Sequence, residues 1–81
     1  MDAPDKNRYE ALDSGELIGV LDYRREGNQI MLDHVEVVPA QRGKGIGELL
    51  VSAAVNEARA DGVQVVPVCP FAVAWLKAHD S

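Results

Sequence analysis

A glycine-rich loop is the segment of this chain with the clearest potential for chemistry. Gln41-Arg42-Gly43-Lys44-Gly45-Ile46-Gly47 carries three alternating glycines and two cations between a predicted strand and a predicted helix. The first turn of a helix presents unpaired N–H groups and a partial positive charge. No Ser, Thr, Asp or Asn precedes this helix to cap those donors. We therefore expect an anion there, held by the loop backbone and by Arg42 and Lys44, and a diphosphate is the obvious candidate.

Two better-known phosphate motifs do not match this loop. A P-loop needs glycine, four residues and then Gly-Lys-Ser/Thr, but Lys44 is followed by Gly45. The dinucleotide-binding fingerprint would need glycines at 43, 45 and 48, and position 48 is Glu. A glycine-rich turn that only starts a helix is the simpler alternative. Such a turn does not require three spaced glycines, two cations and a missing cap.

Cys69 is the second candidate for chemistry. Pro70 suits the first turn of a predicted helix, which puts Cys69 at or beside the helix N-cap. A helix N-terminus favours the thiolate, so Cys69 could accept an acyl group as a nucleophile. The alternative is a small buried hydrophobic residue, the usual role of a free cysteine. His34, His79 and Cys69 have no spacing suited to a metal cluster, so we expect no metal site.

Short strands and two helices are expected to position these residues. Strands are predicted over 8–12, 17–24, 29–38 and 63–66, and residues 1–6 are predicted to be a frayed end. In the third strand, the two-residue period places one set of side chains on a common face: Ile30, Leu32, His34, Glu36 and Val38. Helices are predicted over 46–61 and 70–79. The apolar stripe of the first contains Ile46, Leu49, Leu50, Ala53, Ala54 and Ala58, widened by Val51 and Val55.

This order of elements predicts one α+β domain with an α/β layered architecture over residues 1–81. Tight turns join the first three strands, so we expect an antiparallel meander. The third and fourth strands bracket the first helix as a βαβ unit, which predicts that they are parallel. The fold class is therefore β-β-β-α-β-α, with a mixed sheet and both helices packed on it.

Composition and charge exclude several classes of function. The net charge of −5 argues against nucleic-acid binding, which needs a dense basic face. No run approaches the length of about 20 apolar residues that spans a membrane. The polar start of the chain is unlike a signal peptide, so we expect a cytoplasmic protein. A domain this small gains stability by covering apolar surface, which is compatible with a homodimer.

Three segments together resemble a known family. The loop matches the Gln/Arg-x-x-Gly-x-Gly/Ala pattern of GNAT acyltransferases, which holds the pyrophosphate of coenzyme A. His34-Val35-Glu36-Val37 before the loop and Pro67-Val68-Cys69-Pro70-Phe71 after the next strand resemble the minimal members of that family. The resemblance runs from about residue 15 to His79. It implies a minimal GNAT fold and acetyl-CoA or coenzyme A as the cofactor.

The resemblance also implies roles for particular residues. The backbone N–H groups of 43–47 and the Arg42 side chain would contact pyrophosphate, and Val37 and Val38 would present backbone to the pantetheine arm. By the same analogy, the N–H of Val37 or Val38 would stabilise the oxyanion of acyl transfer. Glu36 and His34 point the same way on a strand and could deprotonate an amine. Each also has a simpler reading, Glu36 as a solvated strand residue and His34 as a partly buried structural one.

The chain departs from the wider family in three places. Tyr9 and Tyr23 both precede the loop, so no downstream tyrosine can protonate the leaving thiolate. Tight turns replace the helices that normally help to form the acceptor site, so that side should be open or completed by another chain. The chain ends His79-Asp80-Ser81, where minimal members typically continue His-Pro-Glu-Tyr.

Three hypotheses about function follow. The first is an N-acetyltransferase that moves an acetyl group from acetyl-CoA to an unidentified amine, either a small molecule or a protein lysine or N-terminus. The second is a non-catalytic module that binds or senses acyl-CoA. The third is a protein-interaction domain with a vestigial loop, which predicts no binding of coenzyme A.

Overall fold

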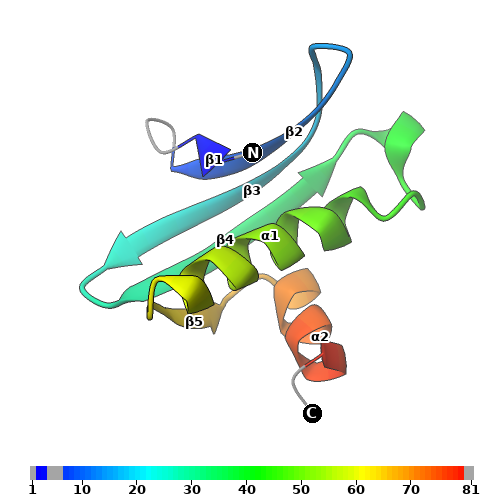
Figure 1. Cartoon of the computed structure of the whole chain (residues 1–81). Coiled ribbons are helices and arrows are strands. Elements are labelled where there is room, and N and C mark those ends of the chain that lie inside the picture. The colour runs from blue at the N-terminus through cyan, green and yellow to red at the C-terminus, as the bar shows by residue number, and fades with distance from the viewer. Residues whose placement is uncertain (1, 4–6, 80–81) are drawn as a thin grey trace.

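A five-stranded sheet and two helices make up the part of the chain that the computed structural model describes, residues 2–3 and 7–79 (Figure 1). The strands are β1 (Asp2–Ala3), β2 (Arg8–Asp13), β3 (Glu16–Glu26), β4 (Gln29–Val37) and β5 (Gln64–Pro67). The helices are α1 (Ile46–Ala60) and α2 (Pro70–His79), and a 3-10 turn at Pro39–Gln41 follows β4.

The sheet has the order β1-β2-β3-β4-β5. Neighbouring strands are antiparallel from β1 to β4, while β5 runs parallel to β4 after the crossover through α1. The predicted fold class, an antiparallel meander plus one parallel strand with helices on the sheet, is confirmed. One element was missed: Asp2–Ala3, within the segment predicted to be frayed, pairs with β2 as a short edge strand.

The core lies between one face of the sheet and α1, and the start of α2 packs beside α1 (Figure 1). The sheet contributes buried Tyr9, Leu21, Tyr23, Ile30 and Leu32, and α1 contributes Leu50, Val51, Ala54, Val55 and Ala58. The predicted stripe on α1 is wrong at two positions, because Leu49 is 66% exposed and Ala53 is also exposed. The three- and four-residue spacing fixed the direction of the buried face but not its width.

A bulge at Asp33 interrupts the pairing of β3 with β4. Tyr23 pairs with Leu32 and Asp22 pairs with His34, so Asp33 is an extra residue on β4. Its carboxylate accepts hydrogen bonds from Arg24 at 2.6 and 3.0 Å. That contact raises the pKa of the Arg24 guanidinium, through the hydrogen bond first and the charge of Asp33 second.

The bulge corrects the predicted faces of this strand. Beyond Asp33, the partners of Leu21 and Gly19 are Val35 and Val37, so these two valines lie on the same face as Leu32 and toward α1. His34 and Glu36 therefore lie on the opposite face from Ile30 and Leu32, not on the same one. Strict two-residue alternation fails here because one inserted residue exchanges the faces of all that follow.

The parallel pairing of β4 with β5 is short and ends in a fork. It covers four residue pairs, from Gln29 with Gln64 to Leu32 with Pro67. At the fork the Leu32 carbonyl accepts hydrogen bonds from both Val68 and Cys69 at 3.0 Å. The chain then enters α2 at Pro70, so β4 continues from Asp33 to Val37 with none of the described strands on its β5 side.

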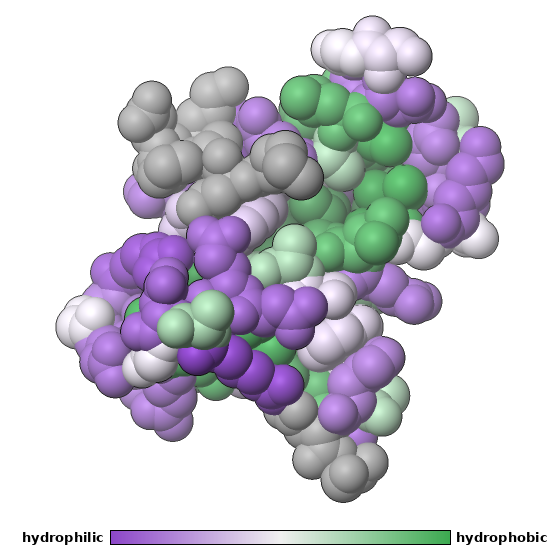
Figure 2. Space-filling view, in the orientation of Figure 1, coloured by the Kyte–Doolittle hydropathy of each residue, from purple (hydrophilic) through white to green (hydrophobic). Residues whose placement is uncertain are grey.

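The end of the sheet near the β2–β3 turn carries exposed apolar surface. Figure 2 shows this area extending from that turn toward the start of α1. Leu12, Leu17 and Val38 are 56%, 41% and 39% exposed at this end of the described structure. Among the described residues, turns rather than helices join β2 to β3 and β3 to β4.

Deleting Asp33 tests whether the bulge sets the faces of β4. The deletion removes the extra residue and restores strict alternation from Leu32 onward, so Val35 and Val37 still face α1 and His34 and Glu36 still face away from it. Because no charge is turned into the core, we expect the free energy of unfolding to fall by only about 1 kcal/mol in urea titrations, through loss of the exposed Arg24–Asp33 ion pair. Asp33→Ala keeps the residue count and loses the same ion pair, so its stability should be similar. A deletion variant that loses about 3 kcal/mol or more, the cost of burying an unpaired charge, would contradict this account.

Candidate functional site

A cavity of about 720 Å³ lies between the free edge of β4 and the start of α1. The β4 segment from His34 to Val37 forms one wall. The loop and first turn of α1 form the other, through Gln41, Arg42, Gly43, Gly45, Ile46, Gly47 and Glu48, and Phe71 of α2 closes one side. The structure therefore brings the predicted phosphate loop and the His34–Val37 segment to one place.

The loop reaches α1 through two glycines in the left-handed region. Gly43 has φ 82° and Gly45 has φ 78°, conformations that cost other residues about 1–2 kcal/mol. Gly45 is the N-cap of α1, and no side chain caps the helix. The first helical hydrogen bond runs from the Leu49 N–H to the Gly45 carbonyl, at 3.0 Å. The N–H groups of the first turn consequently lack helical partners, as the missing cap in the sequence indicated, and such groups can bind an anion.

Gly47 serves a different purpose from the other two glycines. A Cβ at this position would lie 3.0 Å from the Phe71 ring, closer than ordinary packing allows. The missing side chain thus lets the start of α2 approach the start of α1. Phe71 stays 42% exposed and forms part of the cavity wall.

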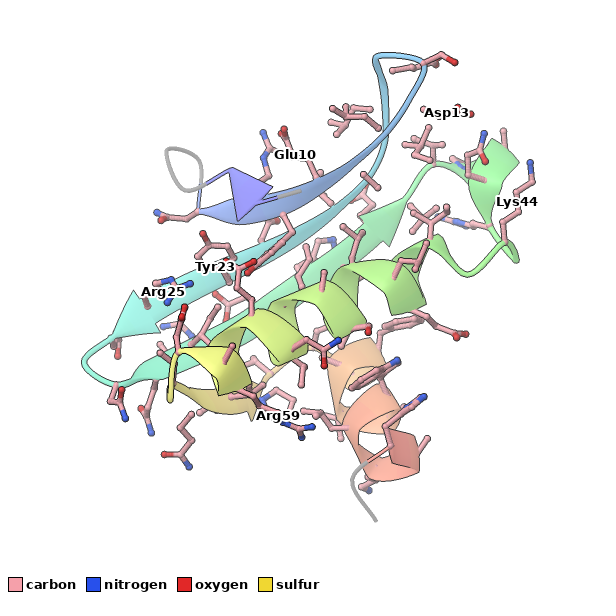
Figure 3. The ribbon with its side chains drawn as sticks, in the orientation of Figure 1. Glu10, Asp13, Tyr23, Arg25, Lys44 and Arg59 are labelled. Carbon is pink, nitrogen blue, oxygen red and sulfur yellow. The ribbon has the colours of Figure 1, made fainter. Side chains whose placement is uncertain are left out.

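Arg42 and Lys44 differ in their relation to the cavity. Arg42 lines it, and its Nε donates to the Val37 carbonyl at 3.3 Å. Lys44 is exposed, lies outside the cavity lining and points away from the sheet (Figure 3). Lys44 can therefore add long-range charge, whereas Arg42 is placed to contact a ligand.

The free edge of β4 is formed by Val35 and Val37 rather than by Val38. The Val38 N–H donates to the Ile18 carbonyl at 2.9 Å, and the Val38 carbonyl accepts from the Gln41 N–H at 2.9 Å. In an antiparallel ladder the bonded positions alternate, so the N–H groups of Val35 and Val37 point away from β3. The expectation that Val38 offers backbone to a ligand is corrected, and Val37 remains.

His34 and Glu36 lie together on β4, as their spacing predicted. The His34 Nε2 and a Glu36 carboxylate oxygen are 3.3 Å apart. Both side chains are exposed, which leaves them open to water and to a ligand. A carboxylate beside an imidazole can accept a proton and share it, so the pair can act as a base.

Cys69 lies at the N-cap position of α2 but away from the cavity. Its carbonyl accepts the Val73 N–H at 3.0 Å, which begins the helix. The side chain belongs to the buried core cluster and is 9% exposed, and Cys69 is not among the residues that line the cavity. The structure thus favours the packing role over a place in the wall of the pocket.

The comparison with protein families decides the identity of this fold. The profile of the family described as GCN5-related N-acetyltransferase matches residues 8–81. The chain belongs to the GCN5-related N-acetyltransferase family. Acetyl-CoA is the cofactor of this family, and the uncapped start of α1 and the free edge of β4 fit its pyrophosphate and amide groups. No curated protein matches the sequence.

Solved structures of three acetyltransferase-type proteins share the fold. A GCN5-like protein from Staphylococcus aureus matches with a TM-score of 0.72 and 29% identity, over 91% of this chain and 74% of that one. The ribosomal-protein-S18-alanine N-acetyltransferase from Escherichia coli matches with a TM-score of 0.75 and 15% identity, over 91% and 52%. An aminoglycoside N-acetyltransferase in complex with CoA matches with a TM-score of 0.60 and 21% identity, over 88% and 61%.

Three cavity residues of this family member were missed by the sequence reasoning. Val35 was assigned to the wrong face because nothing in the residues announces the bulge. Glu48 was not proposed as a site residue, although its place in the first turn of α1 puts it in the cavity wall. Phe71 could have been found from Gly47, since a glycine inside a helix often marks a close neighbour.

No helix within the described residues has the length and apolar character needed to cross a membrane.

Substitutions at Gly45 test the left-handed N-cap of this family member. We expect Gly45→Ala to lower the free energy of unfolding by about 1–2 kcal/mol in urea titrations, because alanine tolerates φ 78° poorly. Gly45→Asn should lose less, since asparagine tolerates this region and can cap a helix. Alanine and asparagine variants of equal stability would argue against the left-handed conformation.

Proposed function

We propose that this protein is an acetyl-CoA-dependent N-acetyltransferase that acts on a primary amine. The observation that carries the proposal is the cavity that joins an uncapped helix start to a free strand edge, with a His34–Glu36 pair on the same strand. Membership of the family supports acetyl-CoA as the donor. The cavity supports binding of that donor, and the His34–Glu36 pair supports removal of a proton from the amine.

The loop and β4 offer complementary groups to the two halves of coenzyme A. The N–H groups of Ile46, Gly47 and Glu48 and the Arg42 guanidinium would hold the pyrophosphate. The Val35 and Val37 backbone would pair with the amides of the pantetheine arm, in the manner of an added strand. The Arg42–Val37 hydrogen bond would then be exchanged for bonds to the ligand.

Bound acetyl-CoA supplies an activated acetyl group, and the protein would orient it and move a proton. The Val35 N–H lies farther from the phosphate loop than Val37 does, as the thioester lies beyond the pantetheine amides, and it would donate to the carbonyl oxygen of the thioester as negative charge develops there. Glu36, with His34 beside it, would take the proton of the amine. Overall, a nitrogen–carbon bond forms and the carbon–sulfur bond breaks. The second proton lost by the nitrogen would pass through water to the sulfur, so that coenzyme A leaves as the thiol.

A non-catalytic acyl-CoA-binding module is the second candidate. The exposure of His34 and Glu36 favours it, because neither side chain is held by surrounding structure in a fixed geometry. This candidate predicts binding of acetyl-CoA that survives Glu36→Ala and Cys69→Ala, with no transfer to any amine. The homodimer and the cytoplasmic location stay predictions.

Arg42→Ala tests the phosphate cradle. We expect the Kd for coenzyme A, measured by calorimetry, to rise about tenfold or more, since a charge-assisted hydrogen bond to phosphate is lost. Lys44→Ala should have a smaller effect that fades with added salt. Arg59→Ala is the matched control, because Arg59 lies at the other end of α1 (Figure 3). Pantetheine lacks the pyrophosphate, so its Kd should not change in Arg42→Ala.

Glu36→Gln tests the proposed base. We expect kcat for acetylation of a primary alkylamine, followed as release of free coenzyme A, to fall roughly 100-fold while the Kd for coenzyme A is kept. Glu57→Gln removes the same charge from the exposed side of α1 and should leave kcat unchanged. Unaltered turnover in Glu36→Gln would remove Glu36 from the mechanism.

Intact mass distinguishes direct transfer from a covalent route through Cys69. We propose direct transfer because Cys69 lies in the core, and we expect no protein-bound acetyl group after incubation with acetyl-CoA. Cys69→Ala should keep the activity of the folded fraction. An added acetyl group that Cys69→Ala abolishes would replace direct transfer by a two-step route.

A further inference from the structure

A second cavity of about 290 Å³ lies on the face of the sheet that carries Glu36. Asp22 and Glu36 belong to the face opposite Leu21 and Val35, whose side chains pack toward α1. No described helix covers this second face beside the cavity. Strands β2, β3 and β4 and the residue that follows β4 form its walls. The lining residues are Arg8, Leu17, Gly19, Val20, Asp22, Glu36 and Val38.

Glu36 lines both cavities. The first cavity follows the free edge of β4, and the second lies over the pairing of β3 with β4. A group held in the second cavity beside Glu36 is thus next to the strand edge along which the first cavity runs. The two cavities meet at one carboxylate, which is the arrangement that a transfer between two ligands requires.

The charges of the second cavity favour a cation. Asp22 pairs with His34 and Val20 pairs with Glu36, so Asp22 and Glu36 are diagonal neighbours on adjacent strands, about 7–8 Å apart. Arg8, the one basic residue of the lining, is the cross-strand partner of Asp22 on β2, but its Nε lies 3.4 Å from a Glu10 carboxylate oxygen. Among the described residues, no lysine or arginine forms an ion pair with Asp22.

The rest of the lining favours an apolar body behind that cation. Leu17 and Val38 are 41% and 39% exposed, and Val20 is the cross-strand partner of Glu36. An alkylammonium group combines the two properties, because its charged head suits the carboxylates and its methylene stem suits the apolar walls. A carboxylate or phosphate ligand would instead meet two negative charges.

We propose that this second cavity is the acceptor site, which binds an alkylammonium group with its head between Asp22 and Glu36. The proposal rests on the transferase function proposed above and specifies its acceptor class. Asp22 holds the ammonium group, and Glu36 takes the proton that the amine must lose. A free alkylamine and the side chain of a lysine present the same group, so the site accepts the chemistry of both.

Amide chemical shifts of the whole protein test the site directly. n-Hexylamine, hexanoate and hexanol are titrated separately into the protein without cofactor. We expect n-hexylamine to shift the amides of Val20, Asp22 and Glu36, and the other two probes to leave them in place. Nα-acetyl-lysine methylamide presents only the side-chain amine of lysine, and alanine amide presents only an α-amine. Comparing their amide shifts shows whether a lysine side chain is accepted as well as a free alkylamine.

Asp22→Asn and a matched control make the test specific. We expect Asp22→Asn to weaken n-hexylamine binding about fivefold, which is the typical effect of one partly exposed charge, and to raise KM for the amine. The Kd for coenzyme A should be unchanged. Glu57→Gln removes a negative charge outside both cavities and should change neither constant.

Two results would overturn the acceptor site. One is an equal response to n-hexylamine, hexanoate and hexanol, and the other is an n-hexylamine response that Asp22→Asn leaves intact. Calorimetry with coenzyme A on the same samples separates this failure from failure of the transferase proposal. Coenzyme A binding without a specific amine response rejects the acceptor site alone, whereas absence of coenzyme A binding rejects the transferase function.

Discussion

The functional architecture depends on the point where β4 and β5 part. Up to Leu32 both edges of β4 are paired, and the Leu32 carbonyl ends the parallel ladder by accepting two N–H groups. Beyond it, the bulge at Asp33 keeps β4 paired with β3 and turns Val35 and Val37 toward α1. The N–H and C=O groups of a buried parallel strand are normally hydrogen-bonded on both edges. The unpaired edge of β4 therefore offers backbone groups that a ligand with amide groups can pair with.

The bulge at Asp33 also determines which side chains of β4 lie on each face of the sheet. Val35 and Val37 line the side toward α1, while His34 and Glu36 project from the other side of the strand. If Asp33 were paired in regular alternation instead of forming a bulge, His34 and Glu36 would point into the core and Val35 and Val37 into water. An acidic protein can nevertheless bind an anion, because the uncapped turn of α1 and Arg42 create a local positive site that the net charge of −5 does not describe.

Much of the fold was predictable because local patterns and global topology agree. Proline and glycine marked the ends of elements, and the apolar spacing of 46–61 gave the main helix within one residue. The loop at 41–47 was identified from residue types alone, since its missing cap is a local property. The bulge was not predictable, because Asp33 has no sequence signal that separates it from an ordinary strand residue. The errors at Val35, Val38 and the faces of β4 follow from it, and Cys69 shows that an N-cap position does not bring a side chain into a cavity.

A structure of the protein with acetyl-CoA bound tests the central claim most directly. The account predicts pyrophosphate oxygens within about 2.9 Å of first-turn N–H groups of α1, pantetheine amides paired with Val35 and Val37, and Arg42 released from the Val37 carbonyl. A cofactor bound elsewhere, or one whose pantetheine arm leaves the Val35–Val37 edge unpaired, would contradict it.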